Sequence, residues 1–399
     1  MEGLSKAMVE SAGGAVELAL GLIGVMTLFL GLMKVAEAGG LLRILARLIR
    51  PLMVRLFPDV PPEHPAMGAM ILNLSANAMG LGNAATPFGI RAMQELDKLN
   101  PQHGTATDAM ALFLAINTSS VTLLPTGVIA LRAAVGSIDP AGILPTTLFA
   151  TTCSTLTAIV AAKLYGRLFS GERRRTPGKE EGHKEVPEQE GAVLPEASEE
   201  TYPVWISLTA LCVLFAMIPI TVAYGKAISP WIIPCLMTGF LIFGVVKRVR
   251  VYEVFVEGAK EGFQVAVRII PYLVAILVAV GMFRASGAME VMVAWLGPLT
   301  GRVGLPVEAL PMALMRPLSG SGAFAIMASI IKDPAIGPDS YIGYLVSTIQ
   351  GCTETTFYVL AVYFGAIRVR RVRHTLAAGL TADAAGLAGS VAACTYLYG

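Results

Sequence analysis

Long apolar segments restrict the fold of this chain more than any other feature of its sequence. A helix that crosses the hydrocarbon core of a bilayer needs about 20 predominantly apolar residues. Because lipid offers the backbone no hydrogen-bond partners, such segments must be helical. We therefore predict an all-α polytopic membrane protein with about eight transmembrane helices. The uninterrupted candidates are Ala15–Met33, Pro203–Ala223, Pro230–Val246 and Val265–Phe283, and those weakened by polar or small residues are Asp108–Leu131, Ala141–Tyr165, Tyr341–Gly365 and Thr375–Leu397.

Composition agrees with this prediction and excludes other classes of protein. Hydrophobic residues make up 55% of the chain and charged residues only 15%, whereas soluble domains carry about 25% charged residues. The net charge is +2, and no basic stripe interleaved with aromatic residues indicates a nucleic-acid partner. The expected partners are the lipid bilayer and a small polar solute, and a homo-oligomer is compatible with the sequence.

The sequence contains no arrangement typical of an enzyme. The five cysteines are scattered through apolar segments without a CxxC pair, and the four histidines show no metal-ligand spacing. A P-loop, a dinucleotide fingerprint and a Ser–His–Asp arrangement are also missing from the sequence. We therefore expect neither catalysis nor a metal site nor a cofactor, with Na⁺ or H⁺ as candidate coupling ions.

One segment departs from the apolar pattern. Ser170–Thr201 is rich in charge, proline and glycine, and almost free of large apolar residues, so it cannot bury a core. We predict a disordered, charged cytoplasmic linker over residues 170–201, which separates residues 1–169 from residues 202–399.

Shorter apolar segments predict helices that do not cross the bilayer. Leu41–Phe57 carries four arginines on one side and should form an amphipathic interfacial helix. Pro65–Leu74 and Pro306–Pro317 are each followed by polar residues and glycine. Helices of that length cover about half of the hydrocarbon core. We therefore predict two re-entrant hairpins with polar tips near mid-membrane.

The order of these parts recurs in the two halves of the chain. A shift of 233 residues places Leu112–Gly166 on Leu345–Gly399 without a gap, and the polar interruption Asn117–Ser120 then falls on Gln350–Thr353. We interpret the two halves as copies of one structural unit.

Charge predicts that the two copies are inverted. The loop Ala133–Gly142 has no Lys or Arg, whereas its counterpart Ala366–Thr375 has four arginines. Positively charged loops favour the cytoplasmic side, so the copies should be inverted repeats, as in many secondary transporters. We expect a multi-pass protein of the inner (cytoplasmic) membrane, with both termini outside and the linker inside.

Several motifs resemble those of the spore maturation proteins. MGLGNAATPFGIRAMQELDKLN (Met79–Asn100) and FLAINTSS (Phe113–Ser120) resemble spore maturation protein A. Spore maturation protein B has motifs similar to EGAKEGF (Glu257–Phe263), MFRASGAM (Met282–Met289), RPLSGSGA (Arg316–Ala323) and CTETTFYVLAVYFG (Cys352–Gly365). The resemblance covers nearly the whole chain outside the linker and looks like a natural fusion. It implies an A-like gate-domain repeat over residues 1–169, and a B-like repeat with two leading transmembrane helices over residues 202–399.

The resemblance also implies membership of the nucleoside-recognition, or gate-domain, group, which is similar to the core of concentrative nucleoside transporters. In that group paired hairpins and broken helices hold the substrate. The family name implies a role in spore core dehydration and cortex formation. A gate-domain relative is associated with dipicolinate, which keeps small anions among the candidate solutes.

Glu354 is the sharpest candidate for a functional residue, because an ionisable group inside an apolar span is costly and usually functional. It lies with Gln350, Thr353 and Thr355 at the interruption of its span. Its carboxylate could bind a cation, carry a proton or accept a hydrogen bond from a solute. The alternative is a buried structural ion pair.

Arg316 precedes the tip of the second predicted hairpin, where Ser319 and Ser321 lie between glycines. Its guanidinium could meet an anionic group of a solute. The alternatives are an ion pair with Glu354 or an extended side chain that reaches the membrane interface.

The first half offers a second set of polar residues. Unwound backbone carbonyls beside such residues can bind Na⁺ or solute hydroxyls in transporters. The alternative role is hairpin capping and hydrogen bonding between helices. The set comprises Asn73 and Asn77 near the first hairpin tip, and Asn117, Thr118, Ser119 and Ser120 in the first broken helix.

Two functions of different classes fit these observations. The favoured one is a transporter that handles a small polar solute, nucleoside-like or a small organic anion, by alternating access around the two hairpins. The alternative is a non-transporting membrane scaffold or regulator of cell-wall (cortex peptidoglycan) maturation. A transporter needs a solvent-reachable cavity at Glu354, Ser319 and Asn117, whereas a scaffold could fill that volume with side chains.

Overall fold

Helices form nearly all regular structure in the part of the chain that is described. The computed structural model describes residues 2–80, 82–120, 122–168, 203–301 and 304–399, so the predicted linker Ser170–Thr201 lies outside the described residues. Among the described helices, four are long and apolar enough to cross a membrane, over Met8–Ala38, Leu144–Leu168, Val251–Ala279 and Thr375–Tyr398. The prediction of an all-α polytopic membrane protein is confirmed.

The described helices follow the same order in both halves: a long helix, a short helix, a hairpin, a broken helix and a final long helix. Both ends of α13 lie 233 residues after the ends of α5, as the sequence alignment predicts. The first half contains α1 (Glu2–Ala38), α2 (Leu41–Leu56), α3 (Pro65–Ala78), α4 (Gly82–Lys98), α5 (Asp108–Ser119), α6 (Thr126–Ala134) and α7 (Ile143–Leu168). After α8 (Val204–Val246), the second half contains α9 (Val251–Ala285), α10 (Ala288–Thr300), the 3₁₀ turn η3 (Val307–Ala309), α11 (Leu310–Met315), α12 (Gly320–Lys332), α13 (Tyr341–Cys352), α14 (Thr356–Ala366) and α15 (Thr375–Tyr398).

Two of the predicted spans differ from the observed helices. Pro203–Ala223 and Pro230–Val246 were expected as separate helices, but α8 runs through both. Gly225 and Pro230 made the segment between them look like a break, but glycine and proline are both tolerated inside membrane helices. The predicted interfacial helix corresponds to α2, in which Arg50 is buried and donates to the carbonyl of Pro62 at 3.1 Å.

Both predicted hairpins form, and capping residues set where their helices begin. In the first hairpin, α3 starts with Pro65 after His64, whose Nδ1 accepts from the amide of Ala66 at 3.2 Å. In the second hairpin, the hydroxyl of Ser319 accepts from the amide of Gly322 at 3.0 Å and begins α12. A side-chain oxygen at this position satisfies an amide that the helix leaves without a partner.

The two interrupted spans are broken where their polar residues lie. The helix α5 ends before Ser120, whose φ of 40° lies in the left-handed region, and the next helix starts only after Pro125. In the second half, α13 ends before the extended Thr353 and α14 begins after Thr355. The segments Asp108–Leu131 and Tyr341–Gly365 therefore each consist of two short helices joined by unwound backbone.

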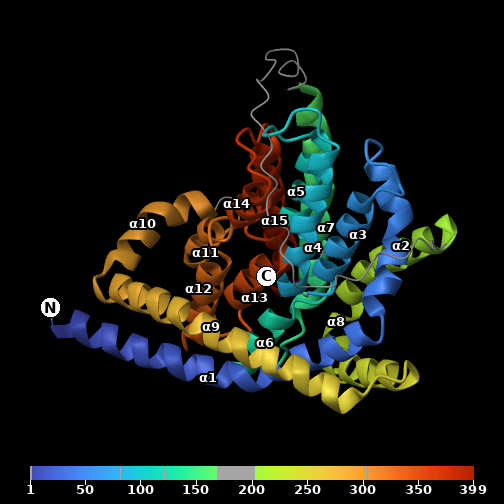
Figure 1. Ribbon diagram of the computed structural model, residues 1–399. Helices are drawn as coiled ribbons and strands as arrows, with labels where there is room; N and C mark the ends of the chain where they lie inside the picture. The colour runs from blue at the N-terminus through green and yellow to red at the C-terminus, as the bar shows by residue number, and fades with distance from the viewer. Residues whose placement is uncertain (1, 81, 121, 169–202, 302–303) are drawn as a thin grey trace.

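The two long helices α1 and α9 lie next to each other (Figure 1), and they pack against α6 and α12, respectively. Glycines allow their backbones to approach closely. A Cβ added at Gly258 would lie 2.7 Å from the carbonyl oxygen of Leu30, and one added at Gly262 would lie 2.7 Å from Cα of Thr27. Small residues of this kind are typical of helix contacts in membranes.

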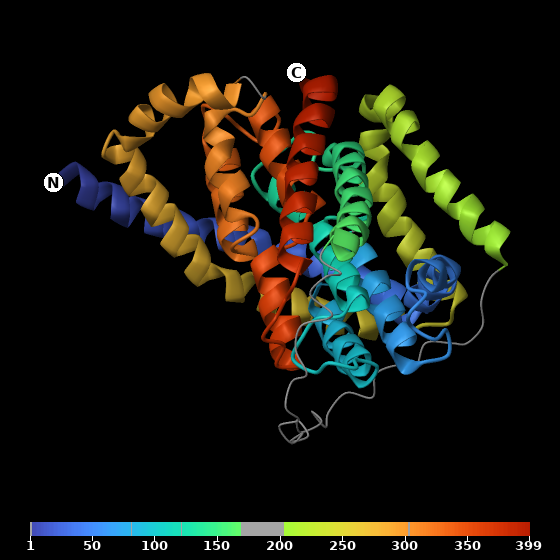
Figure 2. The same ribbon diagram turned by 90° about the horizontal axis from the view of Figure 1, so that it is seen from above.

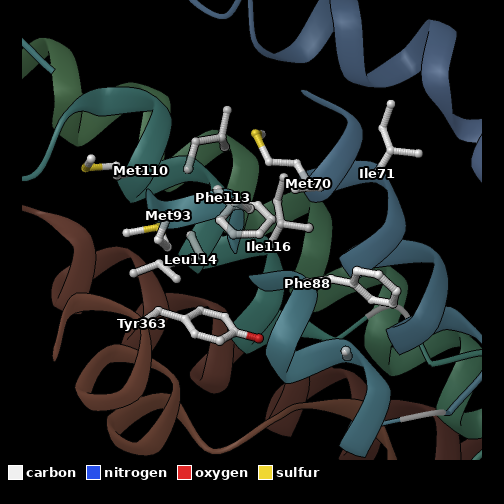
Figure 3. Packing of buried hydrophobic residues seen from close by; sticks show 14 of the residues in the cluster. Met70, Ile71, Phe88, Met93, Met110, Phe113, Leu114, Ile116 and Tyr363 are labelled. Atoms are coloured by element: carbon white, nitrogen blue, oxygen red, sulfur yellow. The ribbon is translucent and has the colours of Figure 1, made fainter. Parts of the chain in front are cut away.

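The hydrophobic core consists of two clusters, and each combines both halves of the chain. The first joins α2, α3, α4 and α5 to α14 and to part of α15, with Tyr363 of α14 facing Phe113 of α5 (Figure 3). The second joins α1 and α6 to α9, α12 and α13. The view from above shows the final helices of the halves, α7 and α15, side by side at the centre (Figure 2). The two parts of each broken helix therefore lie in different clusters, α5 and α14 in the first and α6 and α13 in the second.

Two ion pairs connect the halves in a reciprocal manner. Arg132, at the end of α6, is fully buried, and its Nη2 lies 3.0 Å from Oδ1 of Asp339, just before α13. Arg373, after α14, places Nη1 2.7 Å from Oδ1 of Asp108, the first residue of α5. In both cases an arginine at or just after the end of one broken helix binds an aspartate at the start of the other.

Candidate solute-binding site

The two helix breaks and the two hairpin tips surround a cavity of about 530 Å³. This volume lies within the range of about 300–1,000 Å³ that is typical of small-molecule sites. The first half contributes Asn77, Gly80, Thr122, Leu124, Pro125, Thr126, Gly127 and Val128, and the second half contributes Tyr272, Arg316, Leu318, Ser319, Gly320, Ser321, Phe324, Gln350, Gly351, Thr353, Glu354, Thr355 and Tyr358.

Backbone hydrogen bonds hold the unwound segments in place. In the first half, the amide of Leu123 donates to the carbonyl of Ala78 at 3.0 Å. In the second half, the amide of Phe357 donates to the carbonyl of Pro317 at 3.0 Å. The two breaks also bind each other, because the amide of Glu354 donates to the carbonyl of Thr118 at 2.8 Å. Backbone groups that have left a helix need such partners when they are buried.

Each hairpin tip approaches the break of its own half at a glycine. Gly80 has a φ of 75°, and a Cβ added there would lie 2.5 Å from the carbonyl oxygen of Leu124. A Cβ added at Gly320 would lie 2.7 Å from Oγ1 of Thr355. Both contacts leave no room for a side chain, so the glycines set how closely the tips approach the cavity wall.

Arg316 and Glu354 face each other at the cavity. Arg316 is only 5% exposed; its Nη1 donates to Oγ1 of Thr355 at 3.3 Å, and its Nη2 donates to the carbonyl of Thr353. Nη2 also lies 3.8 Å from Oε2 of Glu354, whose side chain is 45% exposed. That distance is too long for a hydrogen bond. The carboxylate is therefore electrostatically paired but remains accessible from the cavity.

The remaining polar groups give the cavity both donors and acceptors. The first residues of α6 and α12 line it, and helix N-termini present free amides and a positive partial charge. The buried Oε1 of Gln350 has no hydrogen-bond partner among the described residues. Two helix N-termini and Arg316 thus oppose the single negative charge of Glu354, an arrangement that suits a polar or anionic molecule with hydroxyl groups.

Eight of the residues selected from the sequence line this cavity. They come from both hairpin tips and from the second break: Asn77, Arg316, Ser319, Ser321, Gln350, Thr353, Glu354 and Thr355. The other five, Asn73, Asn117, Thr118, Ser119 and Ser120, are not lining residues.

These five residues make structural contacts behind the cavity wall. Asn117 accepts from Nδ2 of Asn77 at 2.9 Å and so orients a lining residue. Nδ2 of Asn73 donates to the carbonyl of Ala85 at 2.7 Å and to the hydroxyl of Tyr363 at 3.2 Å.

The hydroxyls in the first break bind locally. Those of Thr118 and Ser119 donate back to carbonyls of α5, both at 2.9 Å, and that of Ser120 lies 2.5 Å from Oγ1 of Thr122. Their side chains therefore stabilise the end of the helix and the break.

Sequence reasoning missed several residues that the structure brings to this region. Thr122, Thr126, Tyr272 and Tyr358 line the cavity but stand out in no sequence pattern. Asp383, the acid inside the last predicted span Thr375–Leu397, was not selected as a site residue, although an acid in an apolar helix is the same signal that selected Glu354. Among the described residues, no group of three or more His, Cys, Asp or Glu side chains is arranged to hold a metal ion.

Comparisons with known proteins identify the family. Residues 19–135 and 266–369, together more than half of the chain, match the family described as Gate, nucleoside recognition. Spore maturation protein B of Bacillus subtilis (strain 168) is 46% identical over 167 residues, which cover 42% of this chain and 93% of that protein. Spore maturation protein A of the same organism is 46% identical over 165 residues, which cover 41% of this chain and 84% of that protein.

The two curated matches fall on different halves of the chain, as expected for a fusion. No solved structure matches the chain significantly. The chain therefore belongs to the Gate nucleoside-recognition family, and it joins relatives of spore maturation proteins A and B in one membrane polypeptide.

Proposed function

We propose that this protein binds a small polar solute in the cavity between the hairpin tips and moves it across the membrane by alternating access. The observation that carries this proposal is the cavity itself. It is built from the broken helices of both halves, and the buried Arg316 faces the accessible carboxylate of Glu354 inside it. Discontinuous helices that meet at a polar site are typical of secondary transporters.

The arrangement of the halves supports an inverted-repeat mechanism. The elements recur in the same order, and the Arg132–Asp339 and Arg373–Asp108 pairs join equivalent ends of opposite halves. Reciprocal contacts are expected where two copies are related by a two-fold axis. Rocking of one copy against the other would then expose the cavity alternately to each side of the membrane.

The chemistry of the cavity favours two classes of solute. The hydroxyls of a nucleoside could donate hydrogen bonds to the carboxylate of Glu354, and its oxygens could accept hydrogen bonds from the amides at the helix N-termini. A small organic anion could form an ion pair with Arg316. The description of the family as nucleoside recognition supports the first class.

The biological setting follows from the relatives. Their names support a role in spore maturation, with residues 1–169 acting as the A-like unit and residues 202–399 as the B-like unit. We place the protein in the inner membrane with both termini outside and residues 170–201 inside. It acts without catalysis, metal or cofactor, with the bilayer and the solute as its partners.

A binding screen tests the proposal directly. The full chain, purified in detergent, is heated with nucleosides, nucleobases or small dicarboxylates, and a ligand is detected by the rise in unfolding temperature that binding produces. At least one class should stabilise the wild type and the control Glu63→Gln, whose exposed carboxylate lies away from the cavity. The same solute should not stabilise Glu354→Gln.

Two results would count against this function. One is the absence of any stabilising solute for a correctly folded wild type, which would favour the scaffold or regulator of cell-wall maturation. The other is unchanged stabilisation of Glu354→Gln, which would place the solute elsewhere.

A further inference from the structure

Arg316 and Thr353 line both the main cavity and a smaller one of about 190 Å³. Asp383 of α15 lines this smaller cavity together with Cys352 and Thr353, and most of the other lining residues are apolar. Leu380, which also lines it, is 40% exposed, so the cavity lies just beneath the protein surface.

Asp383 has fewer hydrogen-bond partners than an ionised carboxylate requires. The hydroxyl of Thr356 donates to its Oδ2 at 2.6 Å, but its buried Oδ1 has no hydrogen-bond partner among the described residues. The Nε of Arg316 is likewise buried without a hydrogen-bond partner there. A donor and an acceptor that suit each other therefore line the same cavity without being joined.

A buried carboxylate with a single donor needs a proton, a cation or an arginine to balance its charge. Ca²⁺ and Mg²⁺ take six or more oxygen ligands, and this lining offers few besides those of Asp383 and Thr353. No group of three or more His, Cys, Asp or Glu side chains among the described residues could hold another metal ion. Arg316 is held on the other side by Thr353, Thr355 and Glu354. A proton is the occupant that fits the observed arrangement.

We propose that Asp383 is a proton-binding site that controls the position of Arg316. When Asp383 carries a proton, Arg316 stays with Glu354, as observed. When the proton leaves to water, the carboxylate attracts Arg316 and frees Glu354 for the solute. The link to solute handling rests on the proposed function, whereas the proton site stands on its own geometry.

The charged and titratable groups that act on Asp383 are few. Arg316, at the end of α11, and the thiol of Cys352 on α13 are the two that interact with it electrostatically among the described residues. The helix α14 presents the hydroxyl of Thr356, and α7 presents that of Ser154, which donates to the neighbouring carbonyl of Ala382 at 2.8 Å.

Infrared difference spectroscopy tests this proposal without any solute. The full chain in lipid nanodiscs is titrated with acid and base, and the carbonyl-stretch band of protonated carboxyl groups is recorded. Because all 28 Asp and Glu side chains contribute to this band when protonated, the contribution of Asp383 is read from the difference between variants. We expect a pH-dependent component of the band in the wild type and in Glu354→Gln that is missing from Asp383→Asn. In Arg316→Met the band should persist to higher pH, because the ionised Asp383 has lost its nearest cation.

The infrared experiment can refute the proton site independently of the binding screen for solutes. A band that is unchanged in a folded Asp383→Asn variant would refute the proton site, even if solutes bind. If the band is lost in Asp383→Asn but titrates identically with and without Arg316, the proton site would stand and the switch would be refuted. Circular dichroism and size-exclusion chromatography establish that each variant is folded.

Discussion

Replacing Arg132 by methionine should destabilise the association of the two halves. The guanidinium is fully buried and donates to Oδ1 of Asp339 at 3.0 Å, to the carbonyl of Pro338 at 2.6 Å and to that of Asp139 at 3.1 Å. It also lies 4.2 Å from the ring centroid of Tyr344. Methionine fills much of the same volume but replaces none of these polar contacts.

The expected loss of unfolding free energy depends on which polar groups each substitution leaves without a partner. Hydrogen bonds to charged groups contribute about 1.5–3 kcal/mol each. After Arg132→Met, Asp339 remains 25% exposed and keeps its bonds from Ser137 Oγ at 2.5 Å and from the amide of Ile138 at 2.9 Å. We therefore expect a loss of about 3 kcal/mol in unfolding free energy. Asp339→Asn should cost more, roughly 3–5 kcal/mol, because it leaves a buried guanidinium without its hydrogen-bonded counterion.

Unfolding in mixed detergent micelles, followed by circular dichroism as the denaturing detergent increases, measures these differences. Arg370→Met is the matched control, because Arg370 is exposed. The double variant Arg132→Met, Asp339→Asn should be more stable than the sum of the single effects predicts, since the two residues interact directly. Additive effects, or a change below about 0.5 kcal/mol for Arg132→Met, would refute the reasoning.

Three further predictions concern the linker, the topology and pH. When the chain is split at Gly182 and the two pieces are co-expressed, they should form a stable complex that co-purifies, because both core clusters combine the halves. Pieces that insert into the membrane but do not associate would contradict this prediction. The topology is tested with single cysteines in a background without the native cysteines. Ile138→Cys, at a position that is 91% exposed, and Ser198→Cys should react with impermeant reagents from opposite sides of the membrane. Labelling of both positions from the same side would refute the inverted topology. Burial, with the neighbouring Arg373, lowers the pKa of His374 in the folded chain. The unfolded chain therefore binds the proton more readily, and stability should fall as pH drops below about 6.5. His374→Gln should flatten this pH dependence, and an unchanged pH profile in that variant would exclude a contribution of His374.

Local features of the sequence were sufficient to predict the helix breaks and the hairpins. Polar side chains that can bond to the backbone favour helix ends, and Asn117–Ser120 and Gln350–Thr353 each contain the last residue of one helix and the first residue of the break. Apolar segments too short to span a membrane, followed by glycine, predict the hairpins correctly. The 233-residue shift also predicts the bounds of α13 from those of α5.

Contacts between distant residues could not be predicted in the same way. Asn73 and Asn77 look equivalent in sequence, but only Asn77 lines the cavity, whereas Asn73 donates to the carbonyl of Ala85 and to the hydroxyl of Tyr363, 290 residues further along. The pairing of Asp383 with Thr356 likewise depends on how α15 packs against α14. Polarity marks which residues need a partner, whereas the packing of helices decides which partner each receives.

Counterflow in proteoliposomes tests the central claim most directly. Vesicles that contain the purified chain are loaded with unlabelled solute from the binding screen and diluted into labelled solute. The account predicts transient accumulation of label with the wild type, and its loss in both Glu354→Gln and Arg316→Met when each is reconstituted in folded form. Uptake by wild-type vesicles that does not exceed uptake by protein-free liposomes, although the solute binds, would contradict transport through this cavity.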